Sequence, residues 1–307
     1  MSTEQGILRI SIVVTFILAA LGAVIGLIAG SSAIVFDGVY GLIDAVMTVL
    51  ALMVARVIAA SNAADAAGRA YSQRFTMGFW HLEPIVLGVN GMLLTGAALY
   101  AMLDAVGILL RGGHSPAFGP ALLYTGISVV IDLGMALFVR RANRSIGSDF
   151  VALDARGWAM TAALSGSLFA SFLIAYAVKS TSLAWIGPYV DPVALLVICI
   201  VIFPMPIATI RKALSQILLI TPDDLRRQVE DVGDRVAAEQ GFLSHRAYVA
   251  RVGRGIQIEM NFVVPRNGPA RRLEEWDALR DEIGLALGND GPNLWLTIVF
   301  TTDVEWA

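Results

Sequence analysis

The fold of this chain is decided by the stretch Ser31-Ser32-Ala33-Ile34-Val35-Phe36-Asp37-Gly38-Val39-Tyr40-Gly41-Leu42-Ile43-Asp44, where two aspartates interrupt an apolar run. The apolar residues suit contact with lipid or with another helix. A carboxylate inside a membrane segment costs roughly 2.5–3.5 kcal/mol on insertion scales, and it usually faces a bundle interior or a water-filled cavity on an ion path. The stretch therefore indicates a membrane helix that handles an ion, which favours transport.

Composition extends this interpretation to most of the chain. Of the 307 residues, 57% are hydrophobic and 15% are charged, and the mean hydropathy is +0.71. Ordinary soluble domains do not have these values. Residues 1–220 carry 12 basic and 10 acidic side chains, whereas residues 221–307 carry 10 basic and 15 acidic ones. We therefore expect a membrane part followed by a mildly acidic soluble domain, without a basic surface for nucleic acid.

Six segments are long enough to cross a bilayer, which takes about 20 apolar residues in a helix. They are residues 7–30, 34–58, 82–110, 119–139, 150–178 and 190–211. Pro204 and Pro206 predict a kink near the end of the sixth segment. With the N-terminus inside, nine Arg or Lys residues flank the spans on the cytoplasmic side, and only Arg111 and Lys179 lie in outer loops. This asymmetry predicts that both termini lie in the cytoplasm. We expect the host membrane to be an inner or plasma membrane.

The last part of the chain has the pattern of a small α+β domain. Residues 222–240 form a predicted amphipathic helix, and residues 269–287 form a second one that begins at Pro269. Three predicted strands cover residues 246–252, 255–264 and 293–301. The order αββαβ predicts three strands covered on one face by two helices. We assign residues 1–213 to a six-helix transmembrane domain and residues 214–307 to this cytoplasmic domain.

Three motifs, in this order and spacing, resemble those of a known family. They are Gly78-Phe79-Trp80-His81-Leu82-Glu83-Pro84 before the third span, Asp191-Pro192 at the start of the sixth, and Leu214-Ser215-Gln216-Ile217-Leu218-Leu219 followed by Thr221-Pro222. Together with the six spans, they resemble the cation diffusion facilitator family of dimeric metal/proton antiporters over nearly the whole chain. The resemblance implies a homodimer and a cytoplasmic ferredoxin-like domain.

The same resemblance implies where an ion is held. In the family, an i, i+4 pair on the second helix and a matching pair on the fifth form a tetrahedral cage, usually His or Asp followed by Asp. Here the matching segments are Asp37-x-x-Tyr40-x-x-x-Asp44 and Asp154-x-x-Gly157-x-x-x-Thr161. Asp44 keeps its family position, whereas Tyr40, Gly157 and Thr161 replace the other three ligands. The chain therefore resembles a divergent member with a degenerate transport site.

The candidate metal ligands share one property, which is that all of them offer oxygen. They are Asp44, Tyr40, Thr161, Asp132, Asp37 and Asp154. Asp132 lies in the middle of the fourth span, where three roles stay open: a replacement ligand, a proton carrier, or a buried hydrogen bond without a part in transport. Oxygen ligands favour a hard ion such as Mn²⁺ or Mg²⁺ over Zn²⁺. For Asp104 and Asp191, near the outer surface, and for Glu83, at a helix start, we expect structural roles.

Three functions remain open at this point. The first is export of a cation, expected to be a divalent metal, in exchange for protons. The second is a transport-inactive or sensory relative that acts through its dimeric cytoplasmic domain, and the third is transport of a non-metal cation. The sequence contains no nucleophile–base pair, phosphate loop or redox motif, so we expect neither an enzyme nor a prosthetic group.

Overall fold

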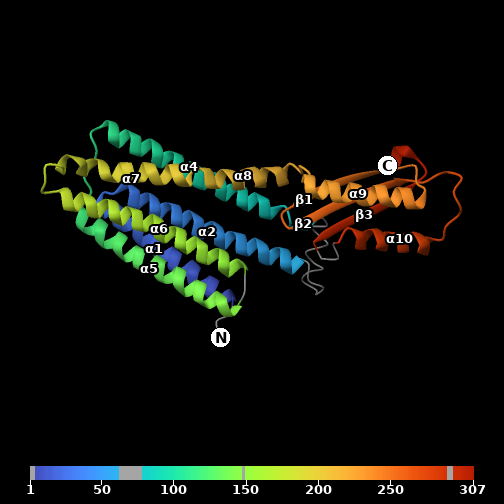
Figure 1. The fold of residues 1–307 in the computed structure, drawn as a ribbon, viewed down its shortest axis with the longest axis horizontal. Coiled ribbons are helices and arrows are strands. Elements are labelled where there is room, and N and C mark those ends of the chain that lie inside the picture. Colours follow the sequence, from blue (N-terminus) through green and yellow to red (C-terminus); the bar gives the residue numbers. More distant parts are fainter. Residues whose placement is uncertain (1–3, 62–77, 147–148, 289–292) are drawn as a thin grey trace. The chain divides into compact units, whose positions relative to one another are not determined.

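The computed structural model describes residues 4–61, 78–146, 149–288 and 293–307 (Figure 1). The chain divides into two compact units. The first comprises residues 1–49 and 89–208, and the second comprises residues 50–88 and 209–307. The predicted division at residue 213 stays a prediction. Each unit is described by itself below.

Six segments of the described chain are helical, long and apolar enough to cross a membrane, as the sequence predicts. The helices are α1 (Glu4–Ala29), α2 (Ser32–Ser61), α4 (Leu82–Leu110), α5 (Phe118–Ile146), α6 (Asp149–Val178), α7 (Gly187–Ile202) and α8 (Pro204–Ile217), with a 3-10 turn, η1 (Ala184–Ile186), before α7. The sixth span is the pair α7 and α8, which is longer than the predicted residues 190–211. The helix is interrupted at the predicted place, because α7 ends at Ile202 and α8 begins at Pro204, with helical backbone angles at Phe203 between them. The bend itself stays a prediction.

Small residues let α1 and α2 pack closely in the first unit. A Cβ atom added to Gly38 of α2 would lie 2.2 Å from the backbone nitrogen of Ala23 and 2.7 Å from the carbonyl oxygen of Ala19, both on α1. Helix association in membranes relies on such close approach, since lipid removes the hydrophobic driving force between helices. The contact fixes the rotation of α2 and therefore the direction in which its aspartates point.

Two aspartates near one end of the bundle have the structural roles that we expected. Asp191 of α7 accepts hydrogen bonds from the Ser31 hydroxyl and from the Ser32 backbone N–H, the latter at 2.9 Å. Asp104 accepts a hydrogen bond from the Ser32 hydroxyl at 3.3 Å. Both carboxyl groups thus hold the start of α2, where free N–H groups favour a negative charge.

The C-terminal part of the second unit has the predicted order αββαβ. Its elements are α9 (Asp223–Gln240), β1 (Ser244–Val252), β2 (Gly255–Val263), α10 (Leu273–Ala286), β3 (Leu294–Thr301) and the 3-10 turn η2 (Val304–Trp306). The sheet order is β1-β2-β3, with β1 antiparallel and β3 parallel to β2. Alternate residues of β2, Ile258, Met260 and Phe262, are buried in one core with apolar residues of both helices.

One helix boundary in this domain was predicted wrongly. The second helix was expected to begin at Pro269, but α10 begins at Leu273. The reason is a cap: the Glu275 side chain accepts a hydrogen bond from the backbone N–H of Arg272 at 3.1 Å. This bond satisfies an N–H group at the N-cap residue Arg272, and it sets the start of the helix at Leu273.

The start of α4 packs on the turn between β1 and β2, also within the second unit. Glu83 accepts hydrogen bonds from the Arg254 backbone N–H at 3.2 Å and from its side-chain Nε at 3.1 Å. A Cβ atom added to Gly255 would lie 2.3 Å from the Trp80 ring, so a larger residue does not fit there. Glu83 lies in the first turn of α4, as expected, and it also binds the hairpin, which the sequence did not indicate.

Candidate functional site

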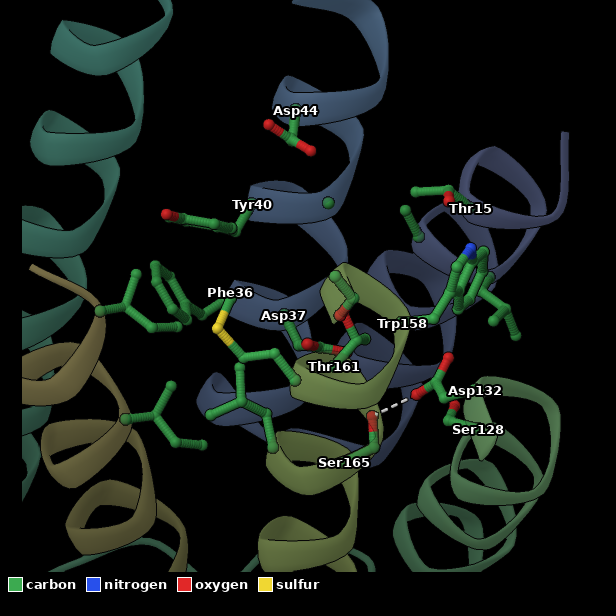
Figure 2. A pocket seen from close by; sticks show the side chains of 18 of the residues that line it. Thr15, Phe36, Asp37, Tyr40, Asp44, Ser128, Asp132, Trp158, Thr161 and Ser165 are labelled. Carbon is green, nitrogen blue, oxygen red and sulfur yellow. Dashed lines mark hydrogen bonds between the residues drawn. The ribbon is translucent and has the colours of Figure 1, made fainter. Parts of the chain in front are cut away.

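A cavity of about 340 Å³ lies inside the first unit (Figure 2). Its lining includes four carboxyl groups, those of Asp37, Asp44, Asp132 and Asp154. Among the described residues that line it, none is Lys, Arg, His or Cys. A set of acids without a cationic side chain in a membrane segment is suited to attract a cation or to hold protons.

Asp44 and Tyr40 lie one helical turn apart on α2. Asp44 is exposed in the isolated chain, and the Asn90 side chain of α4 lies within hydrogen-bonding reach of it. The buried Oδ1 atom of Asn90 has no partner among the described residues. The Tyr40 ring packs against Phe36, with 5.4 Å between ring centroids. Asp44 is therefore accessible, whereas Tyr40 is partly fixed by an aromatic contact.

Asp37 and Asp132 form a second group in the same cavity. Their carboxyl groups are close enough to interact electrostatically, and the Tyr124 hydroxyl lies within hydrogen-bonding reach of Asp37. The hydroxyl of Tyr124 also donates to the Leu18 carbonyl oxygen at 3.2 Å. Asp132 is only 1% exposed, and its Oδ2 accepts a hydrogen bond from the Ser165 hydroxyl at 2.7 Å (Figure 2).

Hydrogen bonds within the protein engage part of the α6 side of the cavity. The Ser11 hydroxyl of α1 donates to Asp154 Oδ1 at 2.9 Å, and the Trp158 indole N–H donates to Ser11. Thr161 donates its hydroxyl to the Gly157 carbonyl oxygen of its own helix at 3.1 Å. Gly157 has no side chain to offer. Asp154 Oδ2, by contrast, is buried and has no partner among the described residues, so this face keeps a carboxylate oxygen available to an ion.

The six predicted ligands all line the cavity, but they do not meet at one point. Within the described ranges, no three His, Cys, Asp or Glu side chains are arranged to hold one metal ion. Asp37 and Asp132 are close enough to interact, whereas Asp44 lies about two helical turns from Asp37 along α2. Their role as metal ligands stays a prediction.

The sequence reasoning missed five polar residues around these acids. They are Ser11, Asn90, Tyr124, Ser128 and Ser165. A signal for some of them exists in the fourth span, where Tyr124, Ser128 and Asp132 follow at intervals of four residues. Residues four apart share one face of a helix. A polar stripe in an otherwise apolar helix therefore marks the face that points inward.

Comparison with known proteins bears on the family to which the chain belongs. Residues 8–218 match the model of the cation efflux transmembrane domain. A search of curated proteins found no match. The matched segment covers the six membrane-spanning segments, apart from the first two residues of the first one, and every carboxyl group that lines the cavity. The chain therefore belongs to the cation efflux, or cation diffusion facilitator, family of membrane transporters.

Proposed function

We propose that this transporter exports a divalent metal cation from the cytoplasm in exchange for protons, and that the cavity carboxyl groups bind both in turn. The observation that carries the proposal is a cavity with four carboxyl groups and, among the described residues, no cationic side chain. Uncompensated charges are costly in a membrane interior. An ion or protons bound to these acids would reduce that cost.

Charge balance supports the exchange with protons. A divalent cation bound by two carboxylates leaves the pair neutral, and so do two protons after the cation has left. Alternating between these states keeps the cavity close to neutral, which the low dielectric of a membrane favours. If the transporter went back to its cation-loading state with two unprotonated carboxylates, their charges would be uncompensated in the membrane interior.

The cavity lining also bears on the class of ion. All side chains in the lining that could ligate strongly offer oxygen atoms. Carboxylate and hydroxyl ligands suit Mg²⁺ and Mn²⁺, whereas Zn²⁺ is usually bound through imidazole or thiolate. We therefore propose a hard cation such as Mn²⁺ or Mg²⁺ as the substrate, with no prosthetic group and no catalytic reaction.

We also propose that the protein is a homodimer with both termini in the cytoplasm, in an inner or plasma membrane. The excess of Arg and Lys beside the predicted cytoplasmic ends of the spans supports this orientation. The family membership supports the dimer.

The test is a flux assay with the purified full-length protein in proteoliposomes. Mn²⁺ and Mg²⁺ uptake is measured together with an internal pH dye, beside Zn²⁺ and an organic cation. We expect saturable flux of a hard divalent cation with opposite movement of protons. Asp44→Asn should abolish this flux, because it removes the most accessible carboxylate of the cavity. Asp104→Asn is the matched control, since it removes a membrane carboxylate that does not line the cavity.

Each outcome has a clear meaning. Flux in wild type and in Asp104→Asn, but not in Asp44→Asn, supports the proposal. The absence of flux for every metal from folded protein would contradict it in favour of a transport-inactive relative. Flux of the organic cation alone would identify a non-metal transporter.

A further inference from the structure

Asp132 is an unusual group for the middle of a membrane helix. It is 1% exposed, and one of its oxygens, Oδ1, has no hydrogen-bond partner among the described residues. Ser128, one turn earlier on the same helix, is 3% exposed, and its hydroxyl lies within hydrogen-bonding reach of Tyr124. Both residues line the cavity. Buried polar atoms without partners are costly, so their presence in a cavity wall calls for a ligand.

A second carboxyl group faces the same place from another helix. Asp37 of α2 lines the same cavity as Asp132, and in Figure 2 both side chains lie below Asp44. Asp37 precedes Asp44 by seven residues, which corresponds to about 10 Å along a helix axis. The Asp37–Asp132 group is thus separate from Asp44 along the cavity wall, as Figure 2 also shows.

The chemistry of this group suits a hard divalent cation. Asp37 and Asp132 supply two carboxylates, and Ser128 and Ser165 supply two hydroxyl oxygens, all of which line the cavity. Mg²⁺ and Mn²⁺ prefer oxygen ligands and often keep several waters in their shell, so four protein oxygens are sufficient. Two carboxylates would also balance the two charges of such an ion.

We propose that Asp37 and Asp132, with the hydroxyl groups of Ser128 and Ser165, form a binding site for a hard divalent cation that is distinct from Asp44. The Ser165 hydroxyl positions Asp132 through its hydrogen bond to Oδ2, which leaves Oδ1 free for the ion. The site joins α2, α5 and α6. This site adds a binding location to the proposed transport function. The class of ion at the site rests on that proposed function.

The test is equilibrium binding of Mn²⁺ to the full-length protein in detergent, measured by calorimetry, so that binding is separated from flux. Asp132→Asn and Asp37→Asn should each weaken one Mn²⁺ site by at least the roughly 10–100-fold that loss of an outer-shell partner costs. The same site should persist in Asp44→Asn and in the control Asp104→Asn. Ser165→Ala, a milder change, should weaken that site by a smaller factor and keep the protein folded.

The outcomes separate this proposal from the proposed function. The site is overturned if wild type binds no Mn²⁺, or if Asp132→Asn and Ser165→Ala bind it as wild type does. It is also overturned if only Asp44→Asn loses binding. Binding that depends on Asp132 but is accompanied by no flux would support the site and contradict the proposed transport. Flux that survives in Asp132→Asn would contradict the site and leave transport intact.

Discussion

Helices α2 and α6 carry matching segments, yet they present different chemistry to the cavity. On α2, Asp44 is exposed in the isolated chain, and Asp37 faces a second carboxyl group. On α6, the Thr161 hydroxyl is bonded to its own helix, and Asp154 accepts a hydrogen bond from Ser11. The difference teaches that a shared pattern of aspartates does not make two equal halves of a site. Free carboxylate oxygens nevertheless remain on α6 as well as on α5, because Asp154 Oδ2 and Asp132 Oδ1 are both buried without a partner among the described residues.

The largest effect is expected from rebuilding the ligand pair on α6, which would break the asymmetry. The double variant Gly157→His with Thr161→Asp places two ligands four residues apart on one helix face. A Cβ atom added to Gly157 meets nothing within 4 Å, so a side chain fits there. With Asp44, the variant would have three of the ligands of a tetrahedral zinc site. We expect Zn²⁺ affinity to rise by at least about 100-fold, measured by calorimetry.

A matched control tests whether the location of these ligands matters. Gly166 of α6 also has room for a Cβ atom, but it does not line the cavity. Gly166→His should leave Zn²⁺ affinity close to that of wild type. An equal rise in this control would show that any added histidine on α6 binds zinc, and it would remove the support for a degenerate cage.

A medium effect is expected from removing the hydrogen bonds that hold Asp154 and Trp158 of α6. Ser11→Ala removes the hydroxyl that donates to Asp154 and accepts the Trp158 N–H. It leaves buried polar groups unpaired, which costs about 1–3 kcal/mol of stability. We expect a lower midpoint of thermal unfolding in detergent. Thr15→Val is the control, because the Thr15 hydroxyl only bonds to the Ser11 carbonyl oxygen of its own helix. Equal midpoints for the two variants would argue against a support at Ser11.

The smallest effect is expected from Thr161→Val. Its hydroxyl already bonds to the Gly157 carbonyl oxygen, and such bonds contribute little to helix stability. We expect stability to change by no more than about 0.5 kcal/mol and Mn²⁺ flux to stay near the wild-type rate. A loss of flux comparable to that of Asp44→Asn would show that Thr161 leaves its own helix during transport and contacts the ion. That result would make the two helices more alike than their present contacts suggest.

The sequence predicted the elements well because their signals are local. Six spans follow from apolar length, and the αββαβ order follows from the change between periods of 3.6 and 2. The interruption of the helix before Pro204 follows from the missing N–H of proline. The start of α10 was missed by four residues, because its cap depends on the side chain of Glu275 and not on the nearest proline.

The sequence by itself determined that this is a six-span membrane protein with costly acids in its helices, and it identified Asp44 by its family position. Only the tertiary structure decided which groups those acids meet. Ser11 and Asp154 are 143 residues apart, and Asp132 and Ser165 are 33 apart. Hydropathy makes a segment helical in lipid, but it does not set the rotation of that helix. Close contacts between small residues, such as Gly38 against Ala19 and Ala23, set it.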